Sequence, residues 1–188
     1  VHPPFVPPMN RLKNQFFEVR GVLILSGVQL AAVDAPFPAG RLKIQGSENL
    51  FEDCVIGQDT IARSAANATI QLVSVSTNVG SARNIFRRCI FPFYASGTAP
   101  LLLLTTGNNA IDRFTLFEDC LFVNSGGAVS TIAGLCTMAA SAGGYVVFKN
   151  PMIVGPITGF GTDADTRAQI QINGVASGST TSGIGYAP

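Results

Sequence analysis

Several residue types on which common chemistries depend are missing or scarce in this 188-residue chain. It has no tryptophan and one histidine, His2, and Asp, Glu, Lys and Arg together make up 12% of the residues. A single histidine in a proline-rich terminal segment excludes histidine-based catalytic triads and histidine-rich metal sites. The formal net charge of +1, without a basic stripe, argues against nucleic-acid binding through phosphate neutralisation. We therefore expect no cofactor, no metal, no nucleic-acid partner and no membrane partner.

The numbers and spacing of the cysteines and aromatic residues narrow the kinds of functional site that the chain could carry. The four cysteines show neither a Cys-x-x-Cys pair nor a Cys/His spacing typical of zinc sites, so we expect them to be small buried core residues. Thirteen phenylalanines against three tyrosines are unlike a sugar-stacking groove, and we expect the phenylalanines to form the core. A free monomer normally carries more charged residues on its surface for solubility than this fraction allows. The low fraction indicates an exterior partly covered by partners.

One short phrase recurs four times along the chain, and it is the strongest signal in the sequence. It reads LFEDCVI, IFRRCIF, LFEDCLF and VFKNPMI, at residues 50–56, 85–91, 116–122 and 147–153. Its phenylalanines are Phe51, Phe86, Phe117 and Phe148, at intervals of 35, 31 and 31 residues. A fixed period in the range of roughly 20–50 residues indicates a solenoid, a propeller or an array.

Each phrase predicts a strand, a two-residue polar corner and a second strand. Phe51, Cys54 and Ile56 can share one interior only if the chain bends at the two polar residues after Phe51. Successive rungs would lie about 4.8 Å apart, so equivalent residues would stack in columns. The predicted inward cysteine column is Cys54, Cys89 and Cys120, with Pro151 in the fourth rung. The predicted outward columns are Glu52, Arg87, Glu118, Lys149 and Asp53, Arg88, Asp119, Asn150. Charge alternates in sign along both, so we predict an exposed ladder that sets the register.

Other segments complete the predicted repeat. Residues 41–45 alternate as the first strand of the repeat region. A second apolar run follows each phrase, at residues 68–75, 100–104, 129–133 and 168–172, with turn-rich segments between. Residues 155–166, rich in glycine, are predicted to be a long loop before the last of these runs.

The phrases resemble the coil repeat of right-handed parallel β-helix proteins, in which an aliphatic or aromatic residue, a polar corner and a cysteine or small residue recur once per turn. The resemblance covers about residues 41–175. It implies an all-β fold, a short right-handed parallel β-helix of about three to four coils. The predicted organisation is an extended N-terminal arm (1–15), an N-terminal cap (16–40), the β-helix (41–175) and a C-terminal arm (176–188).

A catalytic site in such a fold would need carboxylates on one exterior groove. Asp53 and Asp119 would lie two rungs apart, at about 9–10 Å, near the carboxyl separation of inverting glycosidases, roughly 6.5–9.5 Å. Arg88 would sit between them and pair with both, which lowers carboxyl pKa values when a general acid needs a raised one. Asp163 and Asp165 lack the further ligands of a calcium loop. We therefore expect no catalytic residue and no enzyme.

The two ends of the chain suggest assembly. Prolines make residues 1–9 an extended arm, on which Phe5, Val6 and Met9 are expected to bind a partner, and Ile184 and Tyr186 are expected to do so at the other end. By analogy the chain resembles bacteriophage capsid decoration (cement) proteins. That resemblance implies a virion protein assembled in the host cytoplasm, a homotrimer that binds the major capsid protein. The alternatives are a carbohydrate-binding or polysaccharide-degrading, tail-spike-like module and an adhesin-like repeat domain.

Overall fold

The computed structural model confirms an all-β chain. The structure describes residues 22–24, 28–30, 42–44, 46–57, 59, 69–73, 80–95, 102–106, 109–126, 131–132, 134–138, 142–163, 169–173 and 175–176. Sixteen strands and no helix occur in these residues. The predictions made for Phe5, Val6, Met9, Ile184 and Tyr186 lie outside the described residues.

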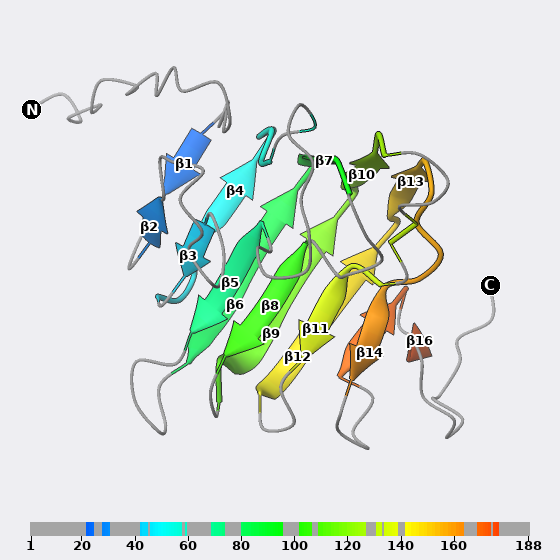
Figure 1. Ribbon diagram of the computed structural model, residues 1–188. Helices are drawn as coiled ribbons and strands as arrows, with labels where there is room; N and C mark the ends of the chain where they lie inside the picture. Colours follow the sequence, from blue (N-terminus) through cyan, green and yellow to red (C-terminus); the bar gives the residue numbers. More distant parts are fainter. Residues whose placement is uncertain are drawn as a thin grey trace, which may run out of the picture.

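The strands form three sheets, which we number 1 to 3 (Figure 1). Sheet 1 has the order β1 (Val22–Ile24), β4 (Leu50–Glu52), β6 (Ser81–Arg87), β9 (Ile111–Glu118), β12 (Gly143–Lys149), β15 (Ile170–Ile172) and β16 (Val175–Ala176). Sheet 2 has the order β14 (Gly161–Asp163), β11 (Cys136–Met138), β8 (Leu103–Thr106), β5 (Ile70–Val73), β3 (Leu42–Ile44) and β2 (Val28–Leu30). Sheet 3 consists of β13 (Met152–Val154), β10 (Leu121–Asn124) and β7 (Ile90–Phe93).

The chain visits the three sheets in a repeating order. From β6 to β15 it passes through sheet 1, then sheet 3, then sheet 2, three times over. Each strand pairs in parallel with its equivalent one repeat away, so that Phe51 is opposite Phe86, Phe86 opposite Phe117 and Phe117 opposite Phe148. The repeated phrases therefore lie in register, because the same side-chain pattern returns to the same place in the sheet.

Antiparallel strands lie at both ends of sheet 1. At one end β1 pairs antiparallel with β4, and β2 pairs antiparallel with β3 at the corresponding end of sheet 2. Both strands fall in the segment where a cap was predicted, residues 16–40. At the other end β16 pairs antiparallel with β15. These strands satisfy backbone groups that would otherwise be left open at the edge of a parallel sheet.

The later part of the repeat differs from the prediction. The apolar run 168–172 was expected to follow the same course as run 68–75, but its strand β15 pairs with β12 in sheet 1. Ile170 and Ile172 lie opposite Val146 and Phe148 there, so the run extends the inward columns of the phrases. Sheet 2 instead ends in β14, within the segment predicted to be a loop. The expected third run, 129–133, contributes an isolated bridge at Ile132, and the strand lies further on, at β11.

Glycine explains why β14 could form where a loop was predicted. A Cβ atom added to Gly134 would lie 2.5 Å from the Cα of Gly161, which no side chain could accept without a shift. Gly161 also has φ +128, a conformation that other residues rarely adopt. The glycines therefore allow the last strand of sheet 2 to approach its neighbour closely.

The core between the sheets is a double stack of phenylalanine rings. Phe51, Phe86, Phe117 and Phe148 stack face to face, with ring centroids 4.5, 4.8 and 5.1 Å apart along the column. Phe91 and Phe122 of sheet 3 form a second stack at 5.3 Å and meet the first edge-on. All six rings are buried. Such aromatic pairs stabilise by about 0.5–1.5 kcal/mol each beyond their buried area.

Candidate functional site

The polar corner of each phrase has one conformation throughout. The second corner residue lies in the left-handed region in all four rungs: φ is 53° at Asp53, 50° at Arg88, 54° at Asp119 and 47° at Asn150. The first corner residue still belongs to its strand, so the bend is confined to one residue. Asparagine and aspartate tolerate this region better than other non-glycine residues do, so three of the four residues suit the corner.

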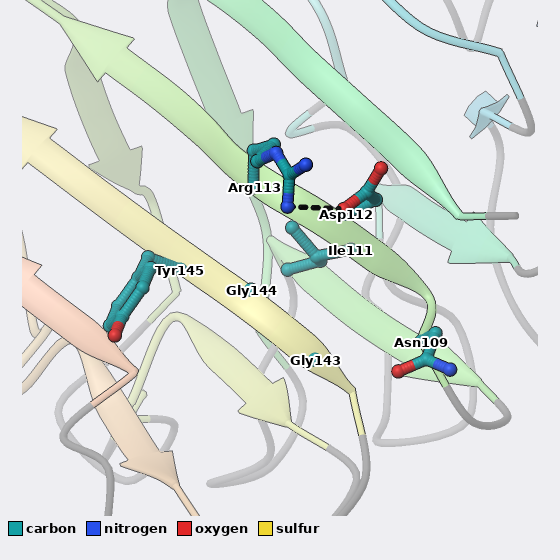
Figure 2. A pocket seen from close by; sticks show the side chains of 7 residues that line it. All are labelled: Asn109, Ile111, Asp112, Arg113, Gly143, Gly144 and Tyr145. Atoms are coloured by element: carbon teal, nitrogen blue, oxygen red, sulfur yellow. Dashed lines mark ion pairs between the residues drawn. The ribbon is translucent and has the colours of Figure 1, made fainter. Parts of the chain in front are cut away.

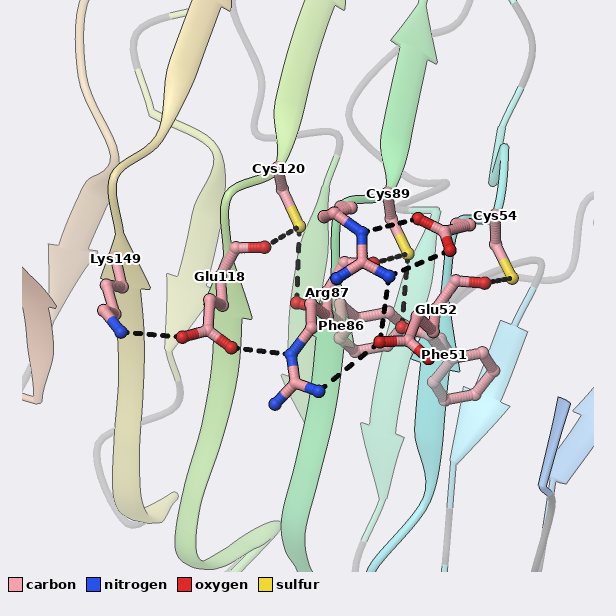
Figure 3. Close-up of polar contacts among 11 residues, drawn as sticks. Phe51, Glu52, Cys54, Phe86, Arg87, Cys89, Glu118, Cys120 and Lys149 are labelled. Atoms are coloured by element: carbon pink, nitrogen blue, oxygen red, sulfur yellow. Dashed lines mark hydrogen bonds and ion pairs between the residues drawn. The ribbon is translucent and has the colours of Figure 1, made fainter. Parts of the chain in front are cut away.

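The first corner column is a continuous chain of ion pairs (Figure 3). Arg87 contacts Glu52 at 3.4 Å and Glu118 at 2.8 Å, and Lys149 contacts Glu118 at 2.7 Å. The Glu118 side chain is 15% exposed, the least of the four, and lies between two cations. Lys149 and Arg87, by hydrogen bonding to it, hold the pKa of Glu118 below its usual value. Charge of alternating sign therefore joins four successive rungs.

The second corner column is only partly paired. Arg88 binds Asp53 through two hydrogen bonds, of 2.7 and 2.9 Å, and also contacts Glu52 at 3.0 Å. The expected pairing of Arg88 with both aspartates is therefore wrong, since its ion pairs among the described residues are with Asp53 and Glu52. Asp119 accepts a hydrogen bond from the Asn150 side chain at 3.2 Å instead. Arg88 lowers the pKa of Asp53, which makes that carboxyl a poor general acid.

The cysteine column points inward. Cys54, Cys89 and Cys120 are at most 1% exposed, and all four cysteines of the chain are free thiols. Cys89 donates to the carbonyl of Phe51 and Cys120 to that of Phe86, each at 3.4 Å, so a thiol links each rung to the preceding one. The Cys120 thiol and burial raise the pKa of Cys89 to about 12. In the part of the chain that the structure describes, no three His, Cys, Asp or Glu side chains are grouped to hold a metal ion.

Sheet 3 presents an apolar surface to solvent. Its outward side chains alternate with the buried rings of the core, and we call the following residues the sheet 3 face: Ile90, Pro92, Leu121, Val123, Met152 and Val154. Ile90 is 39% exposed, Met152 55% and Val154 53%. Exposed faces of sheets usually carry polar side chains in these positions. Six aligned apolar residues without a charge are typical of an interaction surface.

One strand of sheet 3 also has an open edge. β13 pairs with β10 on one side, and the described residues place no strand on its other side. Ile153 is 38% exposed, although its partner Phe122 on β10 is fully buried, because Ile153 belongs to the last rung of sheet 3. An unpaired strand edge offers backbone donors and acceptors to an added strand. The apolar face and the open edge thus adjoin at β13.

The sequence carried a signal for this surface that periodicity alone did not reveal. After each corner the chain is continuously apolar, as in Ile90-Phe91-Pro92-Phe93 and Met152-Ile153-Val154. A strand with one solvated face alternates polar and apolar residues, whereas a continuous apolar run indicates that both faces are covered. The core covers only one face of these strands, so the runs point to a partner on the other.

Comparisons with known proteins leave the function to be argued from the geometry. No protein-family model, curated protein or solved structure matches the chain. Among the described residues there is also no helix long and apolar enough to cross a membrane. The features described so far that could carry a function are the sheet 3 face, the open edge of β13 and the charged corner columns.

Proposed function

We propose that this chain is a non-enzymatic structural protein of a virion, a capsid decoration or cement protein built on a short right-handed parallel β-helix. The cyclic passage of the chain through three sheets supports the β-helix, because each repeat then completes one coil. The in-register pairing of equivalent phenylalanines supports the same assignment. Stacked coils of this kind give a rigid body with long flat outer faces, which suits attachment to a larger shell.

The observation that carries the proposal is the sheet 3 face. Ile90, Met152 and Val154 are 39–55% exposed and aligned with further apolar residues in the neighbouring strand. Burying such a surface against a partner releases water from apolar area and stabilises the complex. A chain with 12% charged residues also gains solubility when this face is covered. Assembly therefore accounts for a surface that an isolated monomer would not need.

The proposed partners follow from the same reasoning. The sheet 3 face contacts other copies of the chain in a closed assembly, for which we propose a homotrimer. The terminal segments bind the major capsid protein, with Phe5, Val6 and Met9 at one end and Ile184 and Tyr186 at the other. An extended terminal segment adds contact area without a larger folded domain, and it can therefore attach a small protein to a shell. The protein would then reside in the virion.

Sedimentation of the native protein from its source tests the proposal. The protein should travel with a megadalton particle and leave it only under denaturing conditions. Recovery as a small free species under native conditions would overturn the assembly role. The partner need not be identified beforehand, because it sediments as part of the same particle.

A pair of substitutions matched in exposure shows whether the sheet 3 face is responsible. Ile90 is 39% exposed on this face, and Tyr145 is 40% exposed on sheet 1. Ile90→Glu should break up the homotrimer and so weaken attachment to the particle, because a carboxylate would be buried between copies without a partner. Tyr145→Glu should leave assembly unchanged. Both variants should keep the parent's circular dichroism spectrum, and equal retention of both in the particle would contradict the proposed role of the face.

A further inference from the structure

Sheet 1 contains an irregularity in β9 that the repeat does not require. On one side of β9, Ala82 pairs with Asp112 and Asn84 with Thr115, so β9 has one residue more than β6 over this stretch. On its other side the partners are Gly143 with Ile111 and Tyr145 with Phe114, which again leaves one extra residue in β9. This is a β-bulge, a feature that redirects a side chain out of the regular alternation.

The bulge is built around Arg113. Its φ is 84°, the largest positive value among the non-glycine residues that the structure describes. Positive φ at a residue other than glycine carries some strain, and such residues occur at functional sites as well as in turns. The side chain is 69% exposed and forms an ion pair with Asp112, Nη1 to Oδ1 at 3.3 Å. The bulge thus places a cation and an anion next to each other on the outer surface.

A hollow of about 400 Å³ lies beside the bulge (Figure 2). The residues that matter for its chemistry are Asn109, Asp112, Arg113, Gly143, Gly144 and Tyr145. The two glycines bring β12 close to the bulge: a Cβ atom on Gly144 would lie 2.4 Å from the Arg113 carbonyl oxygen. Between them and the Arg113–Asp112 pair lies the side chain of Ile111, which forms an apolar part of the lining. Arg113 and Asp112 stand on one side of the hollow, and Tyr145 on the other.

These groups match a ligand that carries hydroxyl groups on a compact ring. An arginine beside an aspartate offers donors and acceptors next to each other, and a hydroxyl group both donates and accepts. Tyr145, 40% exposed, adds an aromatic face for an apolar ring surface and a polar tip. Asn109 brings an amide to the rim. Small-ligand sites combine a few placed polar groups with apolar surface in the same way, in volumes of roughly 300–1,000 Å³.

We propose that this hollow binds a neutral saccharide of one or two units. Asp112 compensates the charge of Arg113, so the site has no net positive charge with which to select phosphate or acidic sugars. Among the described residues that line the hollow, one carries a carboxyl group, whereas glycoside hydrolysis uses two. The hollow therefore binds the sugar without cleaving it. It lies on sheet 1, away from the sheet 3 face, so that this proposal and the assembly role stand or fall separately.

Saturation-transfer-difference NMR on the full chain tests the proposal. The probes are glucose, galactose, mannose, N-acetylglucosamine and the α- and β-linked disaccharides of glucose, with glucuronic acid as the acidic comparison. At least one neutral sugar should receive saturation, and titration should give its Kd. Tyr145→Ala should weaken that binding at least about tenfold, or 1.4 kcal/mol. Tyr145→Phe keeps the ring and should bind within about threefold of the parent.

Matched variants separate the site from general surface effects. Arg113→Gly removes the side chain while suiting the positive φ, and it should also weaken binding about tenfold. Arg83 has φ 52° in the adjacent strand but does not line the hollow, so Arg83→Gly should bind as the parent does. Tyr94, 37% exposed next to the sheet 3 face, gives the corresponding control in Tyr94→Ala. All variants should melt within a few degrees of their matched controls.

Three results would overturn the proposal. The first is that no neutral sugar of the panel receives saturation, or that glucuronic acid alone does. The second is that Tyr145→Ala binds as tightly as the parent. The third is that Tyr94→Ala or Arg83→Gly weakens binding as much as the variants in the hollow. None of these results would bear on whether the protein sediments with a particle, so failure here leaves the assembly test intact.

Discussion

Arg88 binds Asp53 across adjacent rungs with both arms of its guanidinium, Nε to Oδ1 at 2.7 Å and Nη2 to Oδ2 at 2.9 Å. Both residues hold left-handed backbone conformations, with φ of 50° and 53°. The corner geometry is thus kept even where the residue is an arginine, which is less suited to it than asparagine or aspartate. The ion pair and the corner conformation can be separated experimentally, because different substitutions affect them differently.

Arg88→Asn and Arg88→Val both remove the ion pair, but only asparagine suits the left-handed corner. We expect Arg88→Asn to melt close to the parent, because the lost pair is exposed and asparagine relieves the backbone. Arg88→Val should melt at least about 3 °C lower than Arg88→Asn, since a β-branched residue is disfavoured at positive φ. Thermal unfolding followed by circular dichroism gives both values. Equal melting temperatures for the two variants would show that the corner conformation carries little strain.

Phe117 should be among the positions most sensitive to truncation. Its ring stacks between Phe86 and Phe148 and meets Phe91 and Phe122 edge-on. Phe117→Ala should lower the free energy of unfolding by about 3–5 kcal/mol, because it removes these contacts and leaves a cavity. Urea unfolding at equilibrium measures this free energy.

Phe114 provides the control in the same strand. It is half-buried and points to the outer face of sheet 1. Phe114→Ala should therefore lower the free energy of unfolding by about 1 kcal/mol or less, as partly exposed positions usually do. A loss at Phe114 equal to that at Phe117 would contradict the assignment of the phenylalanine column to the core.

The stability that Glu118 contributes should depend on pH. Its pKa in the folded protein lies below the ordinary value of 4.5, because Lys149 and Arg87 favour the carboxylate. The unfolded chain therefore takes up this proton first as the pH falls. The stability that the Glu118 carboxylate contributes is fully present above pH 4.5. It is lost as the pH falls through the lowered pKa that Glu118 has in the folded protein.

Comparison with Glu118→Gln isolates this effect. The difference in melting temperature between the parent and the glutamine variant should be constant near neutral pH and shrink below pH 4.5. Added salt should reduce the difference at neutral pH as well, because the pairs with Lys149 and Arg87 reach the surface. A difference that grows on acidification would show that the carboxylate destabilises the fold.

The four thiols should be protected in the native protein. Cys54, Cys89, Cys120 and Cys136 are buried and free, and burial raises the pKa of Cys136 above its usual range. Because all four side chains are buried away from the reagent, alkylation at pH 8 should be slow until the protein unfolds. Mass spectrometry should find no modified cysteine in native protein and four in denatured protein. Rapid labelling of Cys89 without unfolding would contradict its inward orientation.

The repeated phrase made the inner columns predictable, because identical side chains one repeat apart can bury themselves together only in register. Phe51 and Phe86 illustrate this: the same residue, followed by the same polar corner, returns to the same position in the sheet. The corner itself was predictable as a bend, since Phe51 and Cys54 could not otherwise both face inward. The sequence also carried a signal for which of its two residues bends, since the second is aspartate or asparagine in three of the four rungs and the first is never either.

The candidate sites were harder to predict from the sequence, for two physical reasons. The bulge at Arg113 comes from one inserted residue within a strand, and no glycine or proline marks it in the sequence. Phe114 lies on the outer face, in alternation with the buried Thr115 and Phe117, although the phenylalanines were assigned to the core. The sheet 3 face was missed because only the inward residues of each phrase were considered, and the apolar residues between them were not. Which of these residues face solvent depends on how each strand pairs with the strands one repeat away.

The antiparallel strands at the two ends of sheet 1 limit how copies of the chain can join. A copy that continued the repeat of another copy would have to add its strands in parallel, as successive rungs do within the chain. β1 and β16 run the wrong way for that continuation and lie on both edges. Continuation of the parallel repeat is thereby interrupted in sheet 1, whereas the sheet 3 face lies along the side of the stack.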